Sequence, residues 1–257
     1  MSNNIVRYNN GLNGVALRKF SSVDMNLFWA ICSKMKRKQT NKEVFTFSEI
    51  KEISKYKARG VELFANDVIE MADKLGALAF YFEDEHVWER LNLFQRFLVD
   101  KENETLTVQV NEQFEFILNS IGSNFTRFEL ENITKLSSSY SKELYRQLMQ
   151  HRDKNTRKGA WFVKADDFRE LLAIPKSYRM TDIDRQIFKV AEKEFTKIDD
   201  SGNQIFSSFR VEKVKARSGN KISSFKIYFA EPNVFKVPLH NWLEGNWSEG
   251  NRKKSIS

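Results

Sequence analysis

The sequence predicts an α+β fold in two similar halves. The chain of 257 residues is longer than one small module, and two domains of roughly 110 to 120 residues fit the usual domain size. With 41% apolar and 13% aromatic residues it can fill two cores, and only 3 prolines and 10 glycines argue against long disordered tracts. One succession of predicted elements, a helix, a short strand, two helices and a hairpin, occurs twice.

The first half is expected to span residues 1–123. Its first ten residues are polar and are expected to be mobile. Apolar residues at helical spacing predict a helix within 22–38, and "VFTF" (44–47) alternates as a short strand. Ser48 is a suitable N-cap for the next helix. A third helix over 59–75 carries one apolar stripe, with Gly76 as its expected C-terminal stop.

The rest of the first half predicts a small antiparallel sheet followed by a closing helix. Three stretches alternate apolar and polar residues, as half-buried strands do: "LAFYF", "HVWERLNLF" and "LTVQV". "KENE" is the expected turn before the last strand, and "NEQFEFIL" is the expected helix.

The second half, residues 124–240, begins with an extended and then helical lead-in, "FTRFELENITKL". Tyr140, Leu144, Leu148 and His151 share one face of the next predicted helix. The following segments predict a strand, two helices and two strands joined by the "RSGN" turn: "WFV", "ADDFRELL", "TDIDRQIFKVAEKEF", "QIFSSFRVEKVKA" and "ISSFKIYFA". The tail, 241–257, is polar and is expected to be flexible.

The two halves can be overlaid. Leu27 and Phe28 fall on Leu144 and Tyr145, and Phe45 falls on Trp161. Because each half supplies the elements of a winged helix in the same order, the sequence predicts two tandem winged-helix domains.

The net charge of +8 is unevenly distributed. Residues 1–123 hold 16 Lys and Arg against 17 Asp and Glu, whereas residues 124–257 hold 26 against 17. The basic excess of the second half attracts a polyanion and favours salt-sensitive binding through counterion release. A basic surface without a partner is the competing interpretation.

The predicted helix over 181–196 is the best candidate for reading DNA. Thr181 can cap it, with Asp184 completing a capping box. Its apolar back is expected to pack on the domain, leaving Arg185 and Lys189 free to enter a major groove, where arginine suits guanine because its fork reaches two acceptors on one base edge. The alternative is an ordinary amphipathic helix with a solvated face.

Basic residues flank this helix on both sides. The approach supplies Lys176, Tyr178 and Arg179, and the hairpin that follows is a candidate wing that clamps phosphates, with Lys213, Lys215, Arg217 and Lys221. A lysine-rich edge that protects the sheet from aggregation is the alternative.

The equivalent helix of the first half has an acidic polar side, formed by Glu62, Asp67, Glu70 and Asp73. These carboxylates would face phosphate oxygens, which argues against base reading by this helix. The approach to it carries three candidate contacts with the DNA backbone: Lys55, Lys57 and Arg59.

Catalytic and cofactor chemistry finds little support in the sequence. The single Cys32 rules out an internal disulfide and favours a reducing compartment, and three dispersed histidines give no metal-ligand spacing. A glycine-rich phosphate loop is absent, and no apolar run approaches the length of a membrane span. We therefore expect a cytoplasmic protein that is not an enzyme and that uses no metal, cofactor or membrane.

Four segments resemble the initiator replication proteins of iteron-containing, theta-replicating plasmids: "FTRFELENITKLSSSYSKELYRQL", "FRELLAI", "YRMTDIDRQIFKVAEKEF" and "SFKIYFA". The resemblance is closest over 124–230 and looser over 20–120. It implies two winged-helix domains, of which the C-terminal one inserts its recognition helix, here 181–196, into the major groove of double-stranded DNA at each direct repeat of the origin. The N-terminal domain would add phosphate contacts and form a homodimer.

The same resemblance implies a division of roles. Monomers would activate the origin and recruit host helicase or initiator proteins, and dimers would repress the initiator's own promoter. Two other functions remain open on the sequence: a winged-helix transcription regulator without initiator activity, and a rolling-circle nicking enzyme. The nicking enzyme would need metal ligands beside a tyrosine nucleophile, which the dispersed histidines do not provide.

Overall fold

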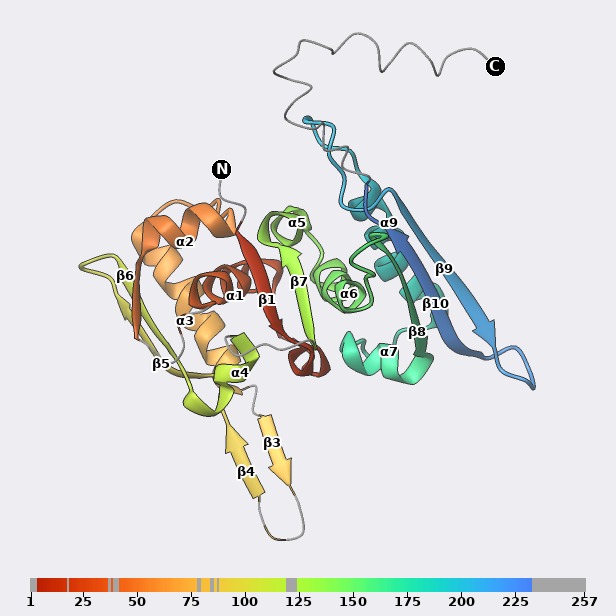
Figure 1. The fold of residues 1–257 in the computed structure, drawn as a ribbon, viewed down its shortest axis with the longest axis horizontal. Helices are drawn as coiled ribbons and strands as arrows, with labels where there is room; N and C mark the ends of the chain where they lie inside the picture. The colour runs from red at the N-terminus through yellow and green to blue at the C-terminus, as the bar shows by residue number, and fades with distance from the viewer. Residues whose placement is uncertain are drawn as a thin grey trace.

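The structure is a computed structural model that describes residues 4–17, 19–36, 38, 42–77, 80–83, 86, 88–118 and 124–232. The tail predicted to be flexible, 241–257, lies outside the described residues. Figure 1 shows two groups of helices, each with its own sheet, on either side of a central ribbon formed by strands β1 and β7.

Three longer helices of the first half surround one apolar core. They are α1 (Ser22–Met35), α2 (Phe47–Ser54) and α3 (Val61–Ala77), and strand β2 (Glu43–Thr46) connects the first two. Phe28, Phe47 and Phe64 are fully or almost fully buried between them. The predicted helices and the short strand are therefore confirmed.

The strands that follow form two separate sheets instead of one. Strands β3 (Phe80–Glu83) and β4 (Trp88–Leu91) make a two-stranded hairpin of their own. Strands β5 (Phe94–Asp100) and β6 (Thr105–Val110) join β2 in the order β2-β6-β5. The single predicted strand over 86–94 was wrong because Asn92 and Leu93 interrupt it. The closing helix is present as η2 (Glu112–Phe114) and α4 (Glu115–Leu118).

The second half begins with β7 (Phe125–Glu129) and α5 (Leu130–Lys135), as the lead-in predicted. Helix α6 (Ser139–Gln150), strand β8 (Lys158–Lys164) and helix α7 (Ala165–Leu171) follow. The predicted third helix is continuous over 180–196 and is divided by hydrogen-bonding pattern into α8 (Met180–Ile183), a π-helical turn η3 (Asp184–Phe188) and α9 (Lys189–Thr196). Strands β9 (Ser208–Lys215) and β10 (Ile222–Ala230) follow, within the part of this half that the structure describes.

The two sheets have the same topology. In each three-stranded sheet, the strand that follows α1 or α6 pairs with the second strand of the hairpin, which gives β2-β6-β5 in the first half and β8-β10-β9 in the second. Phe45 and Trp161, which the sequence overlay superposed, are each only 5% exposed and lie opposite Leu106 and Ile227. The fold is therefore α+β with two winged-helix domains, as predicted.

Three predictions of helix ends were wrong. Thr46, and not Ser48, caps α2, because its hydroxyl accepts from the Glu49 N–H at 3.2 Å while the Glu49 carboxylate accepts from the Thr46 N–H at 2.9 Å. Gly76 does not stop α3, which continues to Ala77. His151 caps the C-terminus of α6 and does not extend its face.

Residues 5–9 form a strand, although the first ten residues were expected to be mobile. Strand β1 (Ile5–Asn9) pairs antiparallel with β7, with Val6 opposite Phe128 and Tyr8 opposite Thr126. Both Val6 and Tyr8 are fully buried. The start of the first half is thus held by a strand of the second half, and a continuous core results.

Helix α6 is buried on all sides between the two halves. Arg146 donates to the backbone oxygens of Leu12 at 2.8 Å and Val15 at 2.6 Å, and its guanidinium pairs with Glu143 at 2.7 Å. On the same helix Lys142 donates to Asn26 Oδ1 and to the Ile133 carbonyl oxygen, each at 2.6 Å. Ionisable side chains of α6 therefore attach it to the segment around η1 (Asn10–Gly14) and to α1.

No helix in the described ranges has the length and apolar character that crossing a lipid bilayer requires.

Candidate nucleic-acid interface

The helix over 180–196 has a buried back and a basic exposed side. Its back consists of Ile183, Ile187, Phe188, Ala191 and Phe195, all buried, and Val190 is half-buried. Arg185, Lys189 and Lys193 follow one another at four-residue spacing on the exposed side, and the Arg185 side chain is 72% exposed. The domain core thus fixes this helix, and three cations point outward.

The helix begins one residue earlier than predicted. Asp182, and not Asp184, completes its first turn, because the Asp182 carboxylate accepts from the Arg179 backbone N–H at 2.9 Å. Thr181 lies inside this turn with an exposed side chain, so its prediction as the cap was wrong.

Two carboxylates of the helix hold basic side chains. Asp182 also pairs with Arg185 at 3.2 Å, which keeps that guanidinium beside the exposed surface of the first turns. Asp184, in the π-helical turn, pairs with Lys213 of β9. Lys213 therefore connects the helix to the hairpin and is already paired within the protein. Single π-helical turns inside α-helices are frequent at functional sites, and this one, Asp184–Phe188, contains Arg185 and ends just before Lys189.

The approach to the helix is held by its own side chains. Arg169 donates to the carbonyl oxygen of Tyr178 at 2.9 Å, and the Tyr178 hydroxyl donates to Gln186 Oε1 at 3.2 Å. Tyr178 is half-buried, whereas Lys176 and Arg179 are exposed on either side of it. Two predicted cations, Lys176 and Arg179, thus lie at the N-terminal end of the helix, whereas Tyr178 packs partly against the core.

The hairpin β9–β10 has a basic tip. Gly219 has φ of 83°, a conformation that favours glycine, and the Ala216 N–H donates to the Lys221 carbonyl oxygen at 2.8 Å to close the turn. Lys215, Arg217 and Lys221 are all exposed, and Lys215 donates to Asn220 Oδ1 at 3.1 Å. The β9–β10 hairpin therefore has the shape predicted for a wing, and its tip carries the predicted exposed cations.

In the first half, Lys55, Lys57 and Arg59 are exposed on the loop between α2 and α3. Helix α3 beyond them presents carboxylates, as predicted, and three of these are already paired: Glu62 with Lys101, Asp67 with the Tyr56 hydroxyl, and Glu70 with Lys74. The loop cations and the acidic helix are therefore separate surfaces of the same domain.

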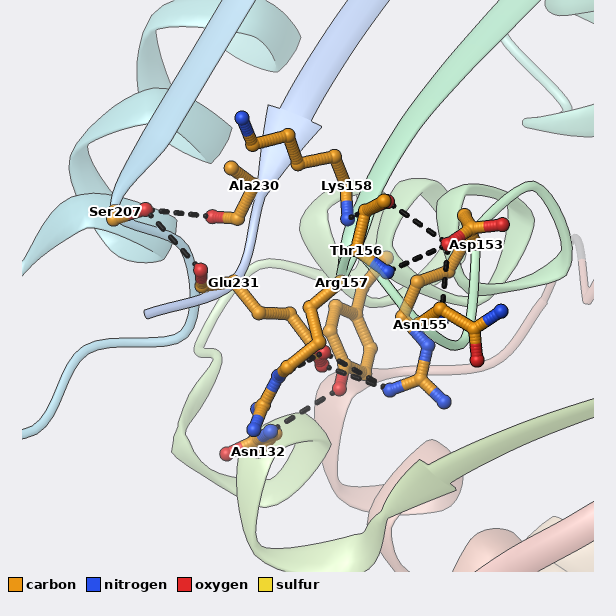
Figure 2. A network of polar contacts seen from close by, with 11 residues as sticks. Asn132, Asp153, Asn155, Thr156, Arg157, Lys158, Ser207, Ala230 and Glu231 are labelled. Carbon is orange, nitrogen blue, oxygen red and sulfur yellow. Dashed lines mark hydrogen bonds and ion pairs between the residues drawn. The ribbon is translucent and has the colours of Figure 1, made fainter. Parts of the chain in front are cut away.

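Sequence reasoning missed a polar cluster at the far end of the second sheet, shown in Figure 2. Glu231 is buried and pairs with Arg152 at 3.0 Å and with Arg157 at 3.1 Å, while its backbone N–H donates to the Arg157 carbonyl oxygen at 2.9 Å. This cluster borders a cleft of about 860 Å³ whose lining includes Arg127, Lys135 and Lys154. Arg157 and Arg152 lie 74 and 79 residues before Glu231 in the sequence, so no local sequence pattern predicts these pairs.

Among the described residues, no group of three histidine, cysteine or acidic side chains is arranged to hold a metal ion.

Two family models match the chain. The one described as "Initiator Replication protein, WH1" matches residues 5–149, and the one described as "Initiator Rep protein, WH2" matches residues 164–229. A curated relative, "Probable replication protein rep" of Bifidobacterium longum (strain NCC 2705), is 38% identical over 178 residues, which are 69% of this chain and 59% of the relative. The chain thus spans less than two thirds of that relative's length.

A solved structure shares the fold. The Pi initiator protein, crystallised in complex with iteron DNA, is similar with a TM-score of 0.70 at 17% sequence identity, over 91% of this chain and 100% of that one. At this identity the likeness supports the fold alone.

Proposed function

The chain belongs to the initiator replication protein family, and from that premise we propose that it is a plasmid replication initiator that binds direct repeats in an origin. In this proposal it opens the adjacent duplex, recruits host replication machinery and represses its own promoter. Its domains divide at residues 1–123 and 124–240, the second of which binds the repeats.

One observation carries the proposal: a helix with a buried back presents Arg185, Lys189 and Lys193 in a single exposed row. Such a helix fits the major groove, about 12 Å wide, and a guanidinium can bind guanine through two hydrogen bonds. Although Asp182 pairs with Arg185, that side chain is 72% exposed, so its guanidinium remains accessible to a base edge.

The wing and the approach supply contacts that do not depend on sequence. Lys215, Arg217 and Lys221 extend from the hairpin, and Lys176 and Arg179 precede the helix. Phosphate contacts of this kind position a protein on the duplex and supply much of its affinity. Lys213 is the weakest member of the predicted set, since Asp184 already binds it.

We assign the first half an auxiliary role. Lys55, Lys57 and Arg59 would contact phosphates from their exposed loop, whereas the carboxylates of α3 would keep that helix out of a groove. This half would also form the homodimer. The protein would work in the cytoplasm without catalysis of its own, using binding free energy and deformable DNA steps to open the duplex.

A footprint over the DNA that flanks the gene tests the proposal. Repeated protection at regular spacing beside an AT-rich tract is the expected result. Protection of one inverted repeat at a promoter would instead indicate a transcription regulator. Incubation of the protected DNA with Mg²⁺ or Mn²⁺ adds a second readout, because strand cleavage would identify a nicking enzyme.

A further inference from the structure

The second sheet has an outer face that the recognition helix does not use. Along its strands, alternate residues point inward: Trp161, Val163, Phe225, Ile227 and Phe229 are buried against the helices. Their neighbours therefore point outward, since side chains alternate along a strand. Phe162 and Lys164 of β8, Lys226 and Tyr228 of β10, and Arg210 and Glu212 of β9 lie on this outer face.

An aromatic pair, the exposed Phe162 and the half-buried Tyr228, lies at the middle of this face. Phe162 is 61% exposed, and its ring meets that of Tyr228 edge to face with centroids 6.1 Å apart. Burial of an aromatic side chain contributes more favourable free energy than burial of most other side chains. A ring this exposed on a sheet is therefore a candidate contact surface. We call Phe162, Tyr228, Lys226 and Arg210 the sheet platform.

Cations surround the two rings. Lys226 Nζ lies 5.9 Å from the centroid of Phe162, and the Arg210 guanidinium lies 5.3 Å from the centroid of Tyr228. Lys158 and Lys164 lie further along β8 and are exposed. Glu212, paired with Arg210, is the one carboxylate on this face of the described strands. The face therefore combines flat apolar surfaces with an excess of positive charge.

Exposed aromatic rings beside cations favour a single-stranded nucleic acid over a duplex. Duplex DNA keeps its base faces stacked on one another, so an exposed ring on a sheet finds nothing in it to stack upon. A single strand offers both unstacked bases and phosphates, and proteins bind it by combining aromatic rings with a basic surface. The two rings and Arg210 would also suit a protein partner, but the three lysines of this face, Lys158, Lys164 and Lys226, are of a type depleted at the centres of protein interfaces.

We propose that the sheet platform binds single-stranded DNA, with bases stacking on Phe162 and Tyr228 while Lys226 and Arg210 swing from the rings to the phosphates. This inference rests on the proposed function, since opening of the origin would supply the strand. Duplex contacts belong to the helix packed on the inner face and to the wing tip, so one molecule could hold a repeat and an opened strand together. Capture of the strand would favour the open state by mass action.

Fluorescence anisotropy with the full chain and a labelled oligothymidylate of about 15 nucleotides tests the proposal. Phe162→Ala should lower the affinity for this single strand about tenfold, the effect expected for loss of one stacked base. Phe162→Trp should retain the affinity. A duplex of unrelated sequence, measured in parallel, should bind the wild type and Phe162→Ala equally.

Ile198→Ala is the matched control, because Ile198 is 63% exposed but lies in the loop after α9. It should leave both affinities unchanged, and thermal unfolding should show that each variant is folded. Cross-linking of an iododeoxyuridine-substituted strand to a peptide containing Phe162 or Tyr228 would support the site directly.

Failure of oligothymidylate to bind, or equal binding by wild type and Phe162→Ala, would overturn the inference. Neither result would affect the proposal that the chain binds direct repeats, because the footprint on duplex DNA tests that proposal separately.

Discussion

At the scale of single residues, Lys142 is the most informative side chain of the domain junction. It is fully buried on α6, and burial lowers its pKa to about 7, against a partial opposing effect of the Glu194 charge. Its two hydrogen bonds go to a side-chain amide and a carbonyl oxygen, both of which a neutral amine can satisfy. The folded protein therefore favours the uncharged form.

This pKa predicts how stability depends on pH. The folded-state pKa lies below the unfolded value of about 10.4, so between these values the unfolded chain binds more protons and stability rises with pH. The difference in unfolding free energy between the wild type and Lys142→Met should therefore grow in favour of the wild type from about pH 7 to about pH 9, by at most about 1.4 kcal/mol per unit. Urea unfolding across this range measures it, and a difference that is constant with pH would show that Lys142 stays charged.

The comparison with Lys142→Met is necessary because other buried groups act in the opposite direction. Burial raises the pKa of the Cys32 thiol, so ionisation in the unfolded state lowers stability above about pH 8.5. Cys32 is present in both proteins and cancels in the difference.

Residue-level prediction succeeded where the signal was local. The apolar back of the 180–196 helix follows from helical spacing, and the exposure of Arg185 and Lys189 follows from it. The roles of Asp182 and Asp184 could not be assigned in the same way. Either carboxylate could cap the first turn, and they are distinguished only in the structure, where Asp182 accepts from the Arg179 N–H and Asp184 pairs with Lys213 of β9.

At the scale of elements, the basic residues of the β9–β10 hairpin are not equivalent. Lys213 is tied to the helix, so the exposed tip, with Lys215, Arg217 and Lys221, carries the phosphate contacts that we propose. The topology of both sheets could be anticipated from the repeated element order. The separate β3–β4 hairpin could not, because strand pairing between successive alternating stretches has no local signature.

Lys221→Ala should weaken binding to every duplex and reduce the slope of log affinity against log salt by about 1, because one phosphate contact is lost. A salt titration with a repeat and an unrelated duplex measures both effects. Lys19→Ala removes an exposed charge from the first half outside the predicted contacts and serves as the control. An unchanged slope for Lys221→Ala would remove the tip from the DNA-binding surface.

At the scale of the whole molecule, the two winged-helix domains are joined into one unit. Strand β1 pairs with β7, and Arg146 of α6 binds backbone oxygens around η1 that lie more than 130 residues away in sequence. Sequence periodicity identifies the helix but not its environment, so the sequence predicted one apolar face where the structure buries every side. A fully buried charged pair is also unexpected from composition.

Arg146→Leu should lower the unfolding free energy by about 3 to 5 kcal/mol, because it leaves the Glu143 carboxylate buried without its partner. The double variant with Glu143→Leu should recover part of this loss. Lys38→Ala, which breaks the exposed pair with Glu43, should cost no more than about 1 kcal/mol. Similar losses from Arg146→Leu and Lys38→Ala in urea unfolding would mean that α6 does not fasten the domains together.

The specificity ratio of Arg185→Ala tests the central claim most directly. Affinities of wild type and variant are measured for a repeat defined by footprinting and for an unrelated duplex of equal length, at one salt concentration. We predict that the variant loses about 10- to 100-fold affinity for the repeat, as expected for one two-pronged guanine contact, and almost none for the unrelated duplex. Equal losses on both DNAs would contradict base reading by this helix.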